Sequence, residues 1–422
     1  GIFSSSVSAP PELREKALDG FAKAFSSGDD VARPAALGVA PGRAEVVGNH
    51  TDYNEGLVLS CAIDRYVVVA GRVAPDGGTQ CRLASETFPG EQVVVQLPKV
   101  DDGDQVPKAD AYEKLKQTGK TAWANYILGV VSELAKIDVH VVGFDAFVVS
   151  NVPAGAGVSS SAALEMATAK LLARLFPNSV GRLDDLTLVK AAKAAENNFV
   201  GMGCGVLDQY SSGMGRAGSL ILIDCRSVSH EVVPMVGAQF VLANTNAPHA
   251  LVDGKYEELR AVCFSAAAAL RKKLGDTVTH LRDVSVDALS EHKDQLTPDE
   301  LRRAEHIVHE NDRVLRGVAA CKEGNLTVLG EALSESHASS RDKFGNSSRE
   351  LDIMQRCSQG IEGCYGSRLM GGGFGGSTIN LVREDCTDSF VEELTKRYQA
   401  ETGIAPTIWV CKPADGAFYE DV

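Results

Sequence analysis

The spacing of apolar and polar residues predicts a succession of helices and strands along the whole chain. Apolar residues recur at helical intervals over residues 11–25, 123–136 and 186–200. Short apolar runs bounded by Gly, Pro and Asp predict strands over residues 66–73, 93–97, 144–150 and 219–224. The polar segment 98–120, which contains Asp101-Asp102-Gly103-Asp104, is expected to form an exposed loop.

A second series of strands and helices begins near residues 227–233. Its clearest helix starts at Thr297-Pro298-Asp299-Glu300, a capping box with Pro in the first turn, and is expected to end near Gly324. Mixed strands and helices in both halves predict two α+β domains, one over residues 1–230 and one over residues 231–422.

Composition narrows the class of protein. The chain has 422 residues and 44% hydrophobic content, which is enough for a substantial core. No apolar segment approaches the length of a membrane span and the N-terminus lacks a signal-peptide pattern, so we expect a cytoplasmic protein. The ten cysteines occur singly and are expected to be reduced thiols. A net charge of −14 argues against nucleic-acid or membrane partners, and the absence of heptads favours a monomer.

A glycine-rich segment at residues 151–163 joins the predicted strand at 144–150 to a predicted helix. Gly155 and Gly157 allow the backbone to approach a ligand closely, and the helix N-terminus that follows attracts anions. Three hydroxyls, those of Ser159, Ser160 and Ser161, stand where they could contact phosphate oxygens or a phosphate-bound magnesium ion. The alternative is that Ser159 only caps the helix and the glycines only turn the chain.

A second glycine-rich segment, at residues 369–377, precedes a predicted strand at 378–382. Five glycines in six positions are costly to order unless the backbone must approach something closely, although a flexible surface turn is the alternative. Two such loops in one chain suit a nucleoside triphosphate and the group with which it reacts. Phosphoryl transfer also needs acids, and Asp52, Glu196 and Asp208 are candidates because each lies among small or apolar neighbours.

Three stretches resemble the signature motifs of the GHMP kinase superfamily, namely residues 41–53, 153–163 and 371–376. Within them, Gly42-Arg43 and Gly48-Asn49-His50-Thr51-Asp52-Tyr53-Asn54 resemble the galactokinase signature. The segment Cys204-Gly205-Val206-Leu207-Asp208-Gln209 resembles the catalytic segment of that family. Weaker similarity continues in the same order over residues 35–415.

The resemblance implies an ATP- and Mg²⁺-dependent sugar 1-kinase. The implied fold is a two-domain GHMP kinase fold, with an N-terminal domain like ribosomal protein S5 domain 2 and a ferredoxin-like C-terminal domain. Asp208 would take the proton of the anomeric hydroxyl, and Arg43 would hold this aspartate ionised. Ser161 and Glu196 would hold magnesium. The implied nucleotide contacts are Trp123, Tyr126, Pro153, Gly155, Gly157, Ser159, Ser160 and Ser161, and the implied sugar contacts are Asn49, His50, Asp52, Gly205 and Tyr256.

One departure from the galactokinase pattern concerns the choice of sugar. Galactokinases carry Glu at the position of Asn49 and Asn at the position of Glu45, as if the two residues were exchanged. The family's glutamate is expected to accept a hydrogen bond from the sugar's 6-hydroxyl, and an amide there would tolerate a uronic acid. Galactose is therefore the leading substrate, with galacturonate, L-arabinose, N-acetylgalactosamine or another hexose as alternatives.

A different class of function is a catalytically silent galactokinase-like protein that binds sugar and ATP and signals to a regulator. Such relatives have an altered serine loop. Here Ser159-Ser160-Ser161-Ala162-Ala163 is intact, as are Arg43 and Asp208. These residues favour the enzyme.

Overall fold

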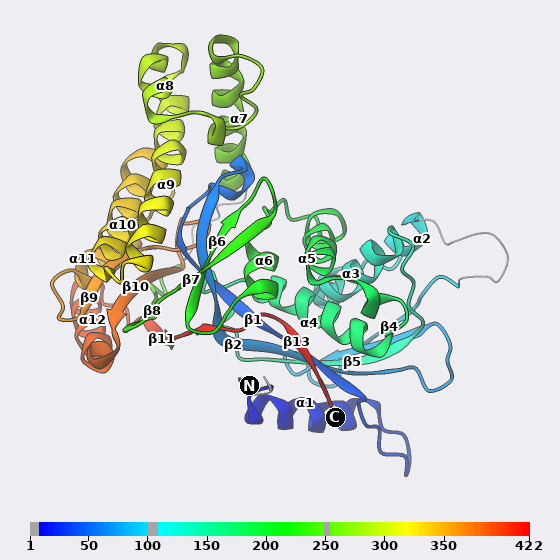
Figure 1. The fold of residues 1–422 in the computed structure, drawn as a ribbon. Helices are drawn as coiled ribbons and strands as arrows, with labels where there is room; N and C mark the ends of the chain where they lie inside the picture. The colour runs from blue at the N-terminus through cyan, green and yellow to red at the C-terminus, as the bar shows by residue number, and fades with distance from the viewer. Residues whose placement is uncertain (1–7, 100–108, 249–253) are drawn as a thin grey trace, which may run out of the picture.

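The computed structural model describes residues 8–99, 109–248 and 254–422, and it contains two β-sheets with helices packed against them (Figure 1). The larger sheet has the strand order β13-β1-β2-β5-β3-β4, and β6, β7 and β12 join it through β2. Its strands are β1 (Ala36–Val47), β2 (Leu57–Val73), β3 (Gln80–Ser85), β4 (Gln92–Gln96), β5 (Phe144–Ser150), β6 (Ser219–Asp224), β7 (Ser229–Pro234), β12 (Pro413–Ala414) and β13 (Phe418–Asp421).

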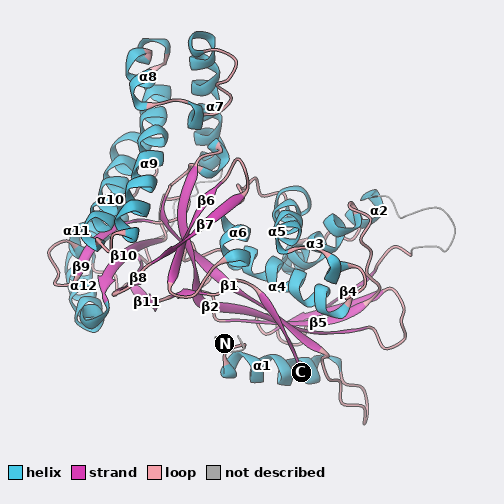
Figure 2. Ribbon diagram, in the orientation of Figure 1, coloured by secondary structure: helices cyan, strands magenta, loops and turns pink. Residues whose placement is uncertain are grey.

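Helices cover both faces of the larger sheet (Figure 2). Helix α1 (Pro11–Phe25) packs on one face through Leu13, Phe21 and Phe25. The other face carries α4 (Ser160–Leu175), which approaches β1 so closely that a Cβ at Gly38 would lie 1.9 Å from the carbonyl oxygen of Ala167. On this side also lie α2 (Ala109–Glu113), α3 (Asn125–Ala135), α5 (Asp185–Ala194) and α6 (Leu207–Met214).

The smaller sheet has the strand order β11-β8-β10-β9 and is antiparallel throughout. Its strands are β8 (Ala238–Asn244), β9 (Cys364–Leu369), β10 (Ser377–Arg383) and β11 (Thr407–Cys411). The helices of this half are α7 (Lys255–Leu274), α8 (Val286–Glu291), α9 (Pro298–Lys322), α10 (Leu326–Ser339), α11 (Arg349–Ser358) and α12 (Thr387–Thr402). Apolar residues of α11 and α12 form one core with β8 and β10, whereas α7, α8 and the N-terminal part of α9 extend away from both sheets (Figure 1). The C-terminal half of α9 packs into the core of the larger sheet through Val314 and Val318.

The chain passes between the two halves more than once. Strand β7 pairs with β6 of the larger sheet, so the predicted division between residues 230 and 231 falls inside a strand. At the C-terminus, β12 and β13 return to pair with β2 and β1. The predicted α+β architecture is confirmed, and the division into 1–230 and 231–422 stays a prediction.

Most predicted elements are present with small changes at their ends. The capping box of Thr297 and Glu300 begins α9 as expected. The predicted helix over 186–200 changes at residue 195 from α5 into a π-helical turn, Ala195–Val200. The exposed loop predicted over 98–120 is wrong in its second half, because α2 forms there and Tyr112 is buried in the core. The acidic stretch Asp101–Asp104 lies outside the described residues.

All ten cysteines are free, and seven of them are buried. Within the described residues, none of the helices combines the length and the apolar character that a membrane crossing requires.

Candidate active site

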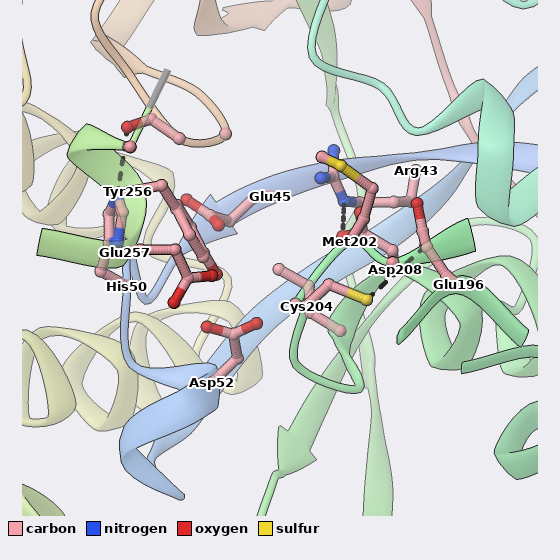
Figure 3. A pocket seen from close by; sticks show the side chains of 16 residues that line it. Arg43, Glu45, His50, Asp52, Glu196, Met202, Cys204, Asp208, Tyr256 and Glu257 are labelled. Carbon is pink, nitrogen blue, oxygen red and sulfur yellow. Dashed lines mark hydrogen bonds and ion pairs between the residues drawn. The ribbon is translucent and has the colours of Figure 1, made fainter. Parts of the chain in front are cut away.

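A cavity of about 540 Å³ opens where the two halves of the chain meet (Figure 3). Strand β1 forms one wall, and the turn before α6, the start of α7 and the second glycine-rich loop form the others. The side chains and backbone that line it come from Arg43, Glu45, His50, Asp52, Glu196, Gly201, Met202, Gly203, Cys204, Leu207, Asp208, Gly254, Tyr256, Glu257, Gly371 and Gly372.

The first glycine-rich loop leads directly into α4, as predicted. Gly155 and Gly157 have φ values of 69° and 75°, which favour glycine, and a Cβ at Gly155 would meet nothing within 4 Å. No side chain caps the first turn of α4. Ser159 has left-handed backbone angles, and its hydroxyl donates to Asp208 rather than to the helix, so the capping alternative is wrong. This helix N-terminus is suited to bind an anion.

Arg43 connects the predicted phosphate-binding loop (residues 153–161, the phosphate loop) to the candidate base, Asp208. Its Nε donates to Asp208 Oδ1 at 2.7 Å, and its Nη1 donates to the Gly157 carbonyl at 2.5 Å. Burial alone would lower the pKa of Arg43, but the carboxylates of Asp208 and Glu45 outweigh it and raise the pKa above its ordinary value. The guanidinium therefore stays charged and fixes the orientation of Asp208.

Glu196 and Ser161 meet beside the same loop. Ser161 Oγ donates to Glu196 Oε1 at 2.9 Å, and Gln209 donates to the other carboxylate oxygen. Burial and the charge of Asp208 raise the pKa of Glu196, so its negative charge is poorly compensated. Oxygen ligands with unbalanced negative charge fit a magnesium ion that takes its remaining ligands from phosphate and water.

Asp52 lies across the cavity from Asp208 and against Gly205 (Figure 3). A Cβ at Gly205 would lie 2.0 Å from Asp52 Oδ2, so only glycine leaves room for this carboxylate. Burial, with smaller contributions from Asp208 and Glu45, raises the pKa of Asp52 to about 6. Such a poorly solvated carboxylate is a strong acceptor for ligand hydroxyl groups.

His50 is held as a neutral imidazole. Its Nε2 donates to the Gly372 carbonyl at 3.1 Å, and its Nδ1 accepts the Tyr53 hydroxyl at 2.7 Å. Burial lowers the pKa of His50 to about 4. Tyr256 of α7 packs against both His50 and Tyr53. The second glycine-rich loop thus lies against the segment that resembles the galactokinase signature.

The predicted adenine contacts lie apart from the cavity. Trp123 precedes α3, and its ring stacks on Phe88 with 6.2 Å between ring centres. Tyr126 is on α3, and burial, followed by the charges of Glu196 and Glu165, raises its pKa. The role of Trp123 and Tyr126 in nucleotide binding stays a prediction.

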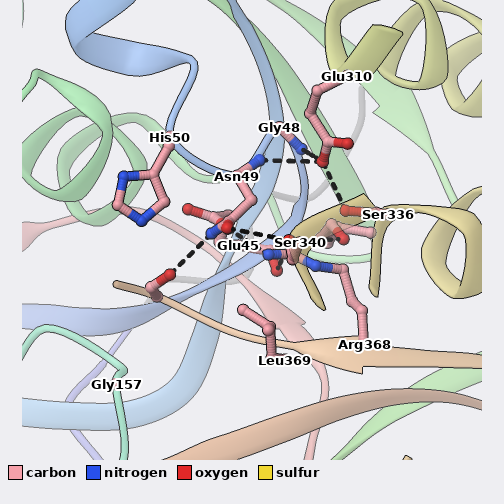
Figure 4. A network of polar contacts seen from close by, with 12 residues as sticks. Glu45, Gly48, Asn49, His50, Gly157, Glu310, Ser336, Ser340, Arg368 and Leu369 are labelled. Atoms are coloured by element: carbon pink, nitrogen blue, oxygen red, sulfur yellow. Dashed lines mark hydrogen bonds and ion pairs between the residues drawn. The ribbon is translucent and has the colours of Figure 1, made fainter. Parts of the chain in front are cut away.

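Two of the predicted sugar contacts, Asn49 and Gly205, are not among the lining residues, and the side chain of Asn49 points away from the cavity. Its side chain is fully buried and is not among the lining residues. Asn49 Nδ2 donates to Glu45 Oε1 at 2.8 Å and to the Gly371 carbonyl at 2.7 Å, and its Oδ1 accepts from Asn346 Nδ2 at 2.9 Å (Figure 4). Glu45 lines the cavity instead, although sequence reasoning did not assign it a role.

Comparisons with known proteins agree with this site. The family model described as "GHMP kinases N terminal domain" matches residues 125–216, and the one described as "Galactokinase galactose-binding signature" matches residues 20–73. A galactokinase of Roseiflexus sp. (strain RS-1) is 38% identical over 382 residues, which cover 89% of this chain and 91% of the relative. A galactokinase of Chloroflexus aurantiacus is 37% identical, covering 91% of this chain and 93% of the relative.

Solved structures lead to the same family. The crystal structure of Lactococcus lactis galactokinase complexed with galactose matches with a TM-score of 0.84 and 29% identity, over 95% of this chain and 98% of that one. The Methanococcus jannaschii mevalonate kinase matches with a TM-score of 0.62 at 16% identity, which shows a shared fold. The predicted GHMP kinase fold is confirmed, and the chain belongs to the galactokinase family.

Proposed function

We propose that this protein transfers the γ-phosphoryl group of ATP to the anomeric hydroxyl of galactose, giving galactose 1-phosphate. The contact of Arg43 with both Asp208 and Gly157 carries the proposal, because it joins the cavity to the phosphate loop. A hydroxyl bound at Asp208 would lie beside the phosphates held by that loop. Proximity of this kind is the main requirement of phosphoryl transfer.

The nucleotide phosphates lie on residues 153–161 and the N-terminus of α4. Ser161 and Glu196 would hold a magnesium ion, which would supply positive charge to neutralise the phosphates. The Ser159 hydroxyl, which donates to Asp208 in this structure, is free to turn toward a phosphate oxygen once nucleotide binds. That rotation frees Asp208 Oδ2 for the sugar.

Asp208 accepts the proton of the anomeric hydroxyl as the oxygen attacks phosphorus. Arg43 keeps Oδ1 occupied and stabilises negative charge on the attacking oxygen. Asp52, His50 and Tyr256 line the rest of the cavity and bind the sugar ring. The free cysteines and the two proposed substrates are consistent with a cytoplasmic location. We also expect the protein to be a monomer.

The experiment is to measure ADP release by the purified protein with MgATP and a panel of sugars. The panel contains galactose, galacturonate, glucuronate, L-arabinose and N-acetylgalactosamine. We expect galactose to have the highest kcat/KM and Asp208→Asn to lower kcat at least about 10²-fold with every sugar that is turned over. No turnover of any sugar in the panel, with sugar and ATP still binding, would replace the proposal with the sugar-sensor function.

A further inference from the structure

Glu45 has one carboxylate oxygen fixed and the other available. Oε1 accepts from Arg368 Nη2 at 2.6 Å and from Asn49 Nδ2 at 2.8 Å. Among the described residues, Oε2 has no hydrogen-bond partner. Arg368 is fully buried, so the ion pair orients Glu45 firmly. The side chain has the arrangement of a preoriented hydrogen-bond acceptor.

The position of Glu45 on β1 directs it to the sugar site. Residues two apart on a strand face the same side and lie about 7 Å apart, so Glu45 shares a side with Arg43. The pairing with β2 is regular between these residues, opposite Ala62 and Ser60. In Figure 3 the Glu45 carboxylate points into the space between His50 and the Arg43–Asp208 pair. A sugar whose anomeric oxygen is at Asp208 therefore has its opposite end near Glu45.

We propose that Glu45 accepts a hydrogen bond from the 6-hydroxyl of the sugar and thereby selects galactose against 6-deoxy and uronic sugars. This inference rests on the proposed function. Asn49 is a positioning residue that holds Glu45 and the Gly371 carbonyl together and makes no contact with the sugar (Figure 4). Arg368 is a second positioning residue.

The negative charge of Glu45 explains why galactose is favoured over a uronic acid. A hydroxymethyl group donates its hydrogen bond to the carboxylate, whereas the carboxylate of a uronate would meet a like charge at short range. Asp52 adds a further negative charge in the same cavity. The pattern of Glu45 and Asn49 thus excludes galacturonate, which an amide in contact with the sugar would have tolerated.

The test compares kcat/KM for galactose and 6-deoxygalactose in the wild type and in Glu45→Gln. Loss of a hydrogen bond to a charged group costs about 10- to 100-fold. We expect the wild type to prefer galactose by that factor and the variant to reduce the preference at least tenfold. An unchanged ratio of the two values in Glu45→Gln would overturn the inference, because a merely structural role lowers both values together.

Glu45→Gln leaves Arg368 without its ion-pair partner and so endangers folding. Two further variants test the inference even if Glu45→Gln does not fold. Glu45→Asp keeps the charge but withdraws the carboxylate by one methylene, and it should also lower the galactose preference. The exchange Glu45→Asn with Asn49→Glu keeps a carboxylate near Arg368 but, because residue 49 points away from the cavity, it should not restore the preference that Glu45→Gln has lost. An exchange variant that binds ADP and regains the galactose preference would contradict the inference. Absence of galactose turnover in the wild type would instead contradict the proposed function.

Discussion

Arg43 and Asp208 form an ion pair of 2.7 Å that joins strand β1 to the first turn of α6. The arginine is nearly buried, and its second contact is the carbonyl of Gly157 in the phosphate loop. One side chain thus fixes the distance between the candidate base and the phosphate site. Removing charge from either partner should affect turnover more than binding.

Asp208→Asn should lower kcat by a factor of about 10² to 10⁴ and leave the affinity for galactose largely intact. The amide cannot take a proton, but it still fills the same space beside Arg43. Steady-state kinetics and calorimetric titration with galactose measure the two quantities. Asp388→Asn on the exposed surface of α12 is the matched control. Unchanged kcat in Asp208→Asn would remove this residue from the role of base.

Ser161→Ala and Glu196→Gln should each raise the Mg²⁺ concentration needed for half-maximal activity by about tenfold or more, or abolish activity. Each change removes one oxygen ligand or its charge from the proposed magnesium site. A magnesium titration at fixed ATP measures the effect, with Glu331→Gln on the exposed face of α10 as the control for loss of an acid. Magnesium titrations of both variants that match the wild type would show that the ion binds elsewhere.

Asp52→Asn should stabilise the folded protein at neutral pH. The pKa of Asp52 is raised from 3.8 to about 6 in the folded state, so the ionised carboxylate costs up to about 3 kcal/mol above pH 6. Protonation removes this cost as the pH falls from 6 toward 4. The difference in unfolding free energy between variant and wild type should therefore shrink over that interval. A difference that stays constant from pH 8 to pH 4 would contradict the burial of an ionised Asp52.

Glu310→Gln should destabilise the protein and weaken galactose binding together. Glu310 of α9 pairs with Arg313 at 2.6 Å and accepts the backbone N–H groups of Gly48 and Asn49 (Figure 4). Loss of one partner from such a buried pair costs about 3 kcal/mol or more. Urea unfolding and the KM for galactose measure the two effects. Lost stability with an unchanged KM would show that this contact does not position the sugar segment.

Gly205→Ala tests the fit of Asp52 in the cavity. The added methyl group must displace the Asp52 carboxylate, because a Cβ there would lie 2.0 Å from Oδ2. We expect the KM for galactose to rise about tenfold to a hundredfold while the KM for ATP changes little. Equal increases in both constants would indicate a general distortion of the turn before α6.

The local elements could be predicted from the sequence because their signals are local. Strands β5 and β6 and the capping box of α9 follow directly from apolar runs and cap residues. The family resemblance likewise assigned roles to six of the sixteen residues that line the cavity, namely Arg43, His50, Asp52, Glu196, Asp208 and Tyr256. The return of β12 and β13 to the first sheet is a pairing between distant segments, and no local pattern specifies it.

The direction of the Asn49 side chain could not be predicted for a related reason. Gly48 and His50 both have positive φ, at 119° and 61°, so the alternation of faces along β1 ends before Asn49. The register with β2 also shifts between Glu45 and Val47. A signature motif gives the order of residues, whereas these backbone angles decide that Glu45 faces the cavity and Asn49 faces the core.

The most direct measurement is the position of the phosphate in the product formed from galactose and MgATP. Phosphorus–proton correlation by NMR on the reaction mixture identifies the carbon that carries the new phosphate. Coupling of phosphorus to the anomeric proton is the predicted result, since we propose that the 1-hydroxyl binds at Asp208 and the 6-hydroxyl at Glu45. Coupling to the C6 protons would show that the sugar binds in the opposite orientation and would contradict the assignment of both residues.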